Sequence, residues 1–128
     1  MLMYYDARPC GMNGMFDTDY FTPLKGYYPF VMFNNLYKLG TAVEADGDCD
    51  NVYAVAAKGD DGMGIMLSYF SEADDDTDGK ILLDIKNGAE KYEMYLLDKD
   101  HDNELVGEAK AGDILTLKPQ SVVYLKSI

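Results

Sequence analysis

The stretch KYEMYLLDKDHDNELVGEAKAGDILTLKPQSVVYLKSI, residues 91–128, decides the fold of this chain. Apolar and polar residues alternate in it, as in Tyr92 and Met94 around Glu93, and clusters of Asp, Asn and Gly interrupt the alternation. A period of two predicts strands with one buried face, and such clusters predict turns. We therefore expect four strands in this stretch, at 91–99, 104–110, 113–118 and 121–127.

The same period extends upstream to residue 41. It predicts four more strands, at 41–45, 52–58, 64–71 and 80–86. Asn87-Gly88, between two of the eight expected strands, is the strongest hairpin signal in the chain. Eight short strands with no helical segment between them predict a mainly β fold, an antiparallel β-sandwich of about eight strands.

Residues 1–40 follow a different pattern, which predicts a strand, a loop and a helix. Residues 2–6 are apolar and aromatic and predict a buried strand, and residues 7–22 contain Pro and Gly and predict a long irregular loop. Thr22-Pro23 matches a helix N-cap followed by proline at the first helical position, and Gly40 matches the cap at the end. Pro29 is expected to kink this helix or to delay its start.

Charge divides the chain at the same place. Residues 1–40 hold three acidic and three basic side chains, together with 10 of the 16 aromatic residues. The whole net charge of −12 therefore lies in residues 41–128. We interpret 1–40 as a strand-loop-helix segment that belongs to an interior or an interface, and 41–128 as a solvated sandwich domain.

Composition excludes several kinds of partner. A chain of 128 residues with 11 basic and 23 acidic side chains repels phosphate backbones and anionic lipid, so we expect no nucleic-acid and no membrane partner. No apolar run approaches the length of a membrane span. The localisation of the protein does not follow from the sequence.

The sequence predicts no cofactor and no metal site. Asp74, Asp76 and Asp78 resemble the opening of a calcium loop, but Ile85 stands where the closing glutamate is needed. We interpret the Asp-rich clusters as solvated turns, with adventitious calcium binding as the alternative. The single histidine, His101, is expected to be an exposed turn residue. Cys10 and Cys49 are expected to be free thiols, because no CxxC motif or nucleophile setting surrounds them.

Polar residues in the aromatic N-terminal segment are the candidate binding residues. Asp6 and Arg8 end the first expected strand, and Asn13 and Asp17 lie on the loop after it. Aromatic rings with Asp, Asn and Arg suit sugar recognition, since rings stack on C–H faces while polar groups bind hydroxyls. The equally weighted alternative is that Asp6 and Arg8 pair with each other and brace the loop.

The order of these elements resembles part of a known enzyme group. The runs YYDARP (4–9), MNGMFD (12–17) and PLKGYYPFVMFNNLYKLG (23–40) resemble the last strand, loop and helix of a (β/α)-barrel glycoside hydrolase. The run ILTLKPQSVVYLKS (114–127) resembles the closing part of the β-sandwich that follows such a barrel. The types that we have in mind are the retaining β-xylosidases and α-arabinofuranosidases.

The resemblance implies a structural role without catalysis. Such enzymes use two carboxylates, which lie on barrel strands that would precede Met1, so no catalytic residue is assigned here. It places Tyr5, Asp6, Arg8 and Asn13 at the barrel mouth, with a substrate-side or loop-bracing role. The expected partners are the catalytic barrel, a carbohydrate, and a second copy bound through residues 1–40, unless that segment packs on its own sandwich. The alternative is a carbohydrate-binding module acting on plant polysaccharide.

Overall fold

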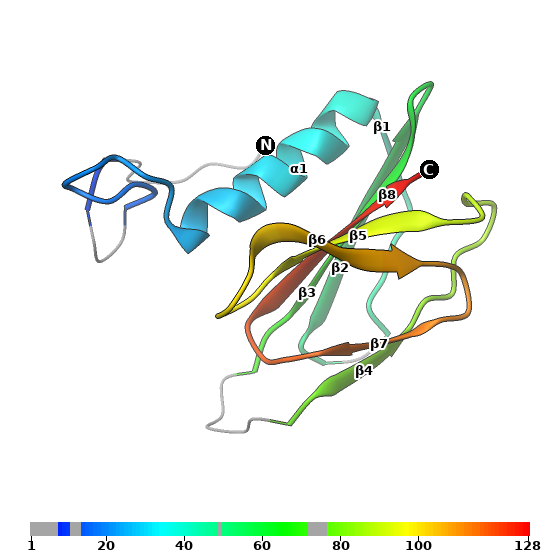
Figure 1. The fold of residues 1–128 in the computed structure, drawn as a ribbon. Helices are drawn as coiled ribbons and strands as arrows, with labels where there is room; N and C mark the ends of the chain where they lie inside the picture. The colour runs from blue at the N-terminus through cyan, green and yellow to red at the C-terminus, as the bar shows by residue number, and fades with distance from the viewer. Residues whose placement is uncertain (1–7, 11–13, 49, 72–76) are drawn as a thin grey trace.

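The computed structural model describes residues 8–10, 14–48, 50–71 and 77–128 (Figure 1). A 3-10 turn, Lys25–Tyr27, leads directly into the helix α1, Tyr28–Leu39. Eight strands follow: β1 Thr41–Val43, β2 Val52–Gly59, β3 Gly62–Tyr69, β4 Gly79–Leu82, β5 Tyr92–Leu97, β6 Asp102–Ala109, β7 Ile114–Leu117 and β8 Ser121–Ser127. No helix in this described part is long and apolar enough to cross a membrane.

The eight strands form two antiparallel sheets, which confirms the predicted fold class. The large sheet has six strands in the order β1-β2-β3-β8-β5-β6, and the small one pairs β4 with β7. In the small sheet Gly79 lies opposite Leu117 and Leu82 opposite Ile114. The small sheet covers one face of the large sheet, and α1 lies across the other face (Figure 1).

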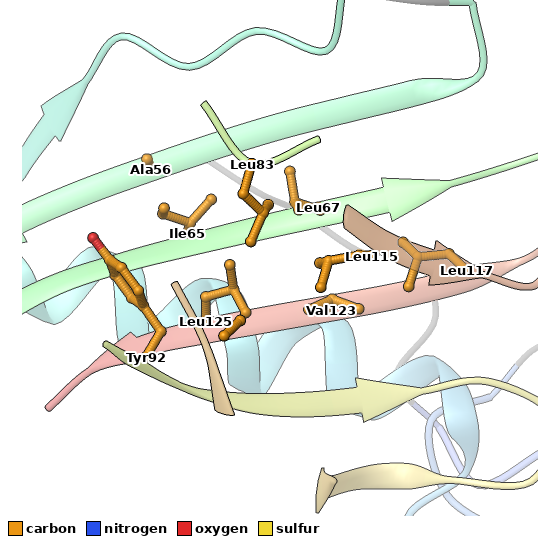
Figure 2. Close-up of a cluster of buried hydrophobic side chains, with 10 residues drawn as sticks. Ala56, Ile65, Leu67, Leu83, Tyr92, Leu115, Leu117, Val123 and Leu125 are labelled. Carbon is orange, nitrogen blue, oxygen red and sulfur yellow. The ribbon is translucent and has the colours of Figure 1, made fainter. Parts of the chain in front are cut away.

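The main core fills the space between the two sheets (Figure 2). Its fully buried members include Tyr92 on β5 and Val123 and Leu125 on β8. The other labelled side chains come from both sheets and from the segments that join them: Ala56, Ile65, Leu67, Leu83, Leu115 and Leu117. Burying a large apolar side chain contributes about 1.5–3 kcal/mol, so this cluster supplies much of the stability of the sandwich.

A second core lies between the large sheet and α1. Met32 and Leu36 of the helix pack with Ala57, Leu97 and Tyr124 of the sheet. Successive strand residues point to opposite faces, so Tyr124 meets the helix while its neighbours Val123 and Leu125 enter the main core. The apolar run Val122–Leu125 therefore marks a central strand that is buried on both faces.

The helix packs on its own sandwich, one of the two arrangements expected from the sequence. A Cβ at Gly64 of β3 would lie 2.8 Å from Cδ2 of Leu36, so the missing side chain lets the helix approach the sheet closely. The division of the chain at Gly40 into a barrel-derived segment and a sandwich domain stays a prediction.

The helix begins later than Thr22-Pro23 predicts. Its N-cap is Tyr27, which makes no side-chain capping hydrogen bond, and Pro29 lies in the first turn. Proline is tolerated there because the first helical N–H groups have no partner within the helix. The delayed start expected from Pro29 is confirmed, as is the Gly40 cap, whose φ is +90° and whose N–H donates to the Tyr37 carbonyl at 3.1 Å.

The predicted hairpin at Asn87-Gly88 is wrong. Asn87 does adopt a left-handed φ of +56°, so the chain turns here. The strand before the turn pairs with β7, however, and β5 after it pairs with β6 and β8. The segment therefore connects the two sheets, because non-local pairings outcompete the local one. The expected strand at 2–6 lies outside the described residues.

Candidate functional site

The tract expected at a barrel mouth is described only in part. Arg8 is exposed, and Tyr5, Asp6 and Asn13 lie outside the described residues. Near Arg8 the backbone is tightly folded, since Pro9 and Phe16 form a parallel bridge. A Cβ at Gly14 would lie 2.3 Å from the Arg8 carbonyl oxygen, so only glycine fits at that position. The assignment of a substrate-side role to Tyr5, Asp6, Arg8 and Asn13 stays a prediction.

Asp17 organises the loop that follows this tract. One carboxylate oxygen accepts the N–H groups of Asp19 at 2.9 Å and Tyr20 at 2.6 Å. The other accepts the N–H of Thr22 at 3.0 Å and the Thr22 hydroxyl. These hydrogen bonds stabilise the charged carboxylate and lower the pKa of Asp17 from 3.8 to about 2, and the bond from the Thr22 hydroxyl has the largest effect. Asp17 is therefore a loop-bracing residue.

We expect the Asp17 turn to resist acid to an unusually low pH. Because the folded pKa lies below the unfolded one, the stabilisation is complete above pH 3.8 and is lost as the pH falls through about 2. The amide resonances of Tyr20 and Thr22, followed by NMR, should titrate with a midpoint near pH 2. Asp17→Asn should abolish that titration and Asp19→Asn should keep it. A midpoint near the ordinary aspartate value would contradict this account.

An ion pair joins the segment before α1 to the β5–β6 hairpin. Lys25 Nζ lies 2.6 Å from Oδ1 of Asp102 and donates to the His101 carbonyl at 3.2 Å. The His101 ring is not an exposed turn residue as predicted, since Nδ1 lies 2.8 Å from Oδ1 of Asp98 and the side chain is half-buried. This hydrogen bond raises the pKa of His101. Burial acts to raise the pKa of Asp98, but the hydrogen bonds from His101 and Asp100 outweigh it and lower that pKa.

A pocket of about 410 Å³ opens between the C-terminal half of α1 and the large sheet. We call it the helix–sheet pocket. Its lining combines two amides, two tyrosines, three charged side chains and three smaller or aliphatic residues: Asn35, Asn103, Tyr95, Tyr124, Lys38, Lys126, Asp61, Leu39, Met63 and Ser127. Sequence reasoning missed this pocket, because its residues come from one helix, several strands and the turn between β2 and β3, which meet only in the folded chain.

A charged network crosses one wall of this pocket. Lys126 Nζ and the Tyr95 hydroxyl both donate to Oε2 of Glu93, at 3.2 and 3.0 Å. The Lys126 hydrogen bond is the largest cause that lowers the pKa of Glu93. Burial first, and then the Glu93 carboxylate, raises the pKa of Tyr95. The network holds the Tyr95 ring, which lies 6.2 Å from the Tyr124 ring, in one orientation.

The large sheet also carries apolar side chains that α1 leaves uncovered. Tyr53 and Val55 alternate with core residues on β2 and share the face of Ala57, which packs on the helix. They are 65% and 45% exposed, and Phe70, just after β3, is 46% exposed. Tyr53, Val55 and Phe70 are named the uncovered patch below. Grouped exposed apolar residues mark interaction surfaces more often than single ones do.

Within the described residues, no three His, Cys, Asp or Glu side chains lie close enough together to hold a metal ion. Part of the Asp-rich segment that resembles a calcium loop lies outside the described residues, and so does Cys49.

Comparison with known proteins finds similarity in structure only. The sequence matches no protein-family model and no curated protein. The fold is similar to part of a GH30 endoxylanase from Clostridium papyrosolvens C71, with a TM-score of 0.72 and 19% identity over 88% of this chain and 30% of that one. It is also similar to part of a glucosidase from Croceicoccus marinus, with a TM-score of 0.53 and 14% identity over 91% of this chain and 35% of that one.

These similarities show that the chain has the fold of a portion of glycoside hydrolase chains and spans about a third of their length. They do not support the finer part of the sequence resemblance. The two solved enzymes are an endoxylanase and a glucosidase, not the β-xylosidase and α-arabinofuranosidase types named from the sequence. The finer assignment rested on the order of the elements and on the apolar run that closes the sandwich, and these features do not separate one enzyme type from another.

Proposed function

We propose that this chain is a non-catalytic accessory region of a glycoside hydrolase, in which it packs against the catalytic barrel. One observation carries the proposal: the structural match takes in 88% of this chain but only 30% of the endoxylanase. Most of that enzyme therefore lies outside the part that resembles this chain. In a barrel glycoside hydrolase the catalytic carboxylates would lie in that remaining part.

The surfaces around α1 support the packing role. One side of the helix is occupied by the sandwich, yet Tyr37 on the helix is 77% exposed. The uncovered patch lies on the same face of the large sheet as the helix. Contact with a barrel would remove these rings from water, at about 25 cal/mol per Å² of apolar area. We propose α1 and the uncovered patch as the contact surface with the barrel.

The length of the natural polypeptide tests the proposal. An antibody raised against this chain should detect, in the source cells, a polypeptide about three times as long, as the 30–35% coverage of the two enzymes implies. Peptide mapping should find a barrel sequence upstream, and the full polypeptide should hydrolyse a glycoside that this chain alone does not. Detection of a polypeptide of only 128 residues, or hydrolysis by this chain alone, would contradict the proposal.

A further inference from the structure

We propose that the helix–sheet pocket binds a neutral sugar unit. Its volume of about 410 Å³ is within the range of small-molecule sites and exceeds what a few ordered waters need. The inference does not depend on the accessory role proposed above, because every residue that carries it belongs to the described part of this chain.

The chemistry of the lining matches a ligand that is rich in hydroxyl groups. A sugar hydroxyl both donates and accepts, and the carboxamides of Asn35 and Asn103 also do both. The Lys38 ammonium only donates, and the Asp61 carboxylate only accepts. Leu39, Met63 and the tyrosine rings supply apolar surface for the C–H groups of a pyranose. Such a lining can donate to and accept from the hydroxyls of one sugar unit while its apolar side chains contact the ring.

Asn103 gives the most direct indication of a ligand. Its Oδ1 atom is buried, and it has no hydrogen-bond partner among the residues that the structure describes. A buried acceptor without a donor is unfavourable, and such groups in native proteins call for a specific explanation. The backbone of Asn103 adopts a left-handed φ of +62°, which asparagine and glycine tolerate better than other residues. A ligand hydroxyl that donates to Oδ1 would satisfy this acceptor.

The charges favour a neutral ligand over an anion. Lys126 already pairs with Glu93 at 3.2 Å, and the carboxylate of Asp61 lies in the same lining as Lys38. The lining therefore has no excess of positive charge once Glu93 is included. The chain as a whole carries a net charge of −12, which repels phosphates and carboxylates.

Titration of the whole chain followed by NMR tests the site. The probes are xylose, glucose, xylobiose and cellobiose, with inorganic phosphate as the anion probe. We expect at least one sugar to cause saturating shifts in the side-chain amide signals of Asn35 and Asn103, with none from phosphate. Asn103→Gly, which suits the left-handed backbone, should weaken binding about tenfold, the effect of one lost hydrogen bond in a buried site. Asn35→Ala should also weaken sugar binding. This variant should keep α1 folded, because alanine favours the helix.

Asn51→Gly is the matched control, because Asn51 is exposed, has a φ of +75° and lies outside the pocket. It should leave the affinity unchanged. The proposal is overturned if no sugar gives saturating shifts, if shifts fall outside the pocket, if only phosphate binds, or if Asn103→Gly binds as tightly as the parent. None of these results depends on the length of the natural polypeptide. The sugar site can therefore be disproved while the accessory role stands, and the accessory role can be disproved while the sugar site stands.

Discussion

Replacing Met32 with alanine is expected to lower the free energy of unfolding by about 2–5 kcal/mol. Met32 is fully buried between α1 and the large sheet, in contact with the cluster that contains Leu36 and Tyr124. Truncation removes apolar contacts and leaves a cavity that the helix and the sheet cannot close completely. In urea denaturation the midpoint should fall while the slope stays unchanged.

The control for this prediction lies on the same helix. Tyr37 is 77% exposed, and Tyr37→Ala should change the free energy of unfolding by no more than about 0.5 kcal/mol. If Met32→Ala and Tyr37→Ala had the same urea midpoint, the helix would not unfold cooperatively with the sandwich. The experiment therefore also tests whether the stable unit extends upstream across Gly40.

The outer side of α1 belongs to the contact surface proposed for the barrel. If Met32 anchors α1 to the sandwich, the helix presents Tyr37 to a partner as part of a rigid surface. A rigid surface loses little conformational entropy on contact with a barrel. The same anchoring sets the distance between Asn35 on the helix and Asn103 on β6, and so the shape of the helix–sheet pocket.

The fold class followed from the sequence because strand periodicity and turn residues are local signals. The last strand was predicted with its bounds, Ser121–Ser127, and in the structure the turn before it ends at Gln120 with a left-handed φ of +57°. The Gly40 cap was predicted for a similar reason. The start at Thr22-Pro23 was wrong and the later start allowed by Pro29 was right. Thr22-Pro23 satisfies the local rule for a helix start, but Thr22 bonds the Asp17 carboxylate instead.

What could not be predicted depends on contacts between distant segments. Asn87-Gly88 has the composition of a hairpin turn, but β4 gains more by pairing with β7. The helix–sheet pocket forms only where α1, which packs on β2 and β3, comes close to residues of β5, β6 and β8 in the folded chain. Nothing in the local sequence of Asn103 signals that its side-chain oxygen will be buried. The Lys25–Asp102 ion pair likewise joins residues far apart in the chain.

Tyr92→Ala is expected to be at least as damaging as Met32→Ala, with a loss of about 3–5 kcal/mol as for other large aromatic truncations. Tyr92 is fully buried in the main core, where it packs with Leu125 and other apolar side chains (Figure 2). A domain of this size has about 5–15 kcal/mol of stability in total, so the variant should be close to unfolding at room temperature. Circular dichroism during urea denaturation measures the loss.

Tyr92→Phe separates the contribution of the ring to stability from that of the hydroxyl. The hydroxyl oxygen accepts the N–H of Ala89 at 2.9 Å, and it lies 3.5 Å from the sulfur of Met63. Removing it leaves the Ala89 N–H without that acceptor, at a cost of about 1–3 kcal/mol, and the ring packing is kept. Tyr92→Phe should therefore lie between the parent and Tyr92→Ala. If both variants lost the same free energy, the hydroxyl hydrogen bond, and not the buried ring, would be what stabilises the turn at Asn87-Gly88 against β5.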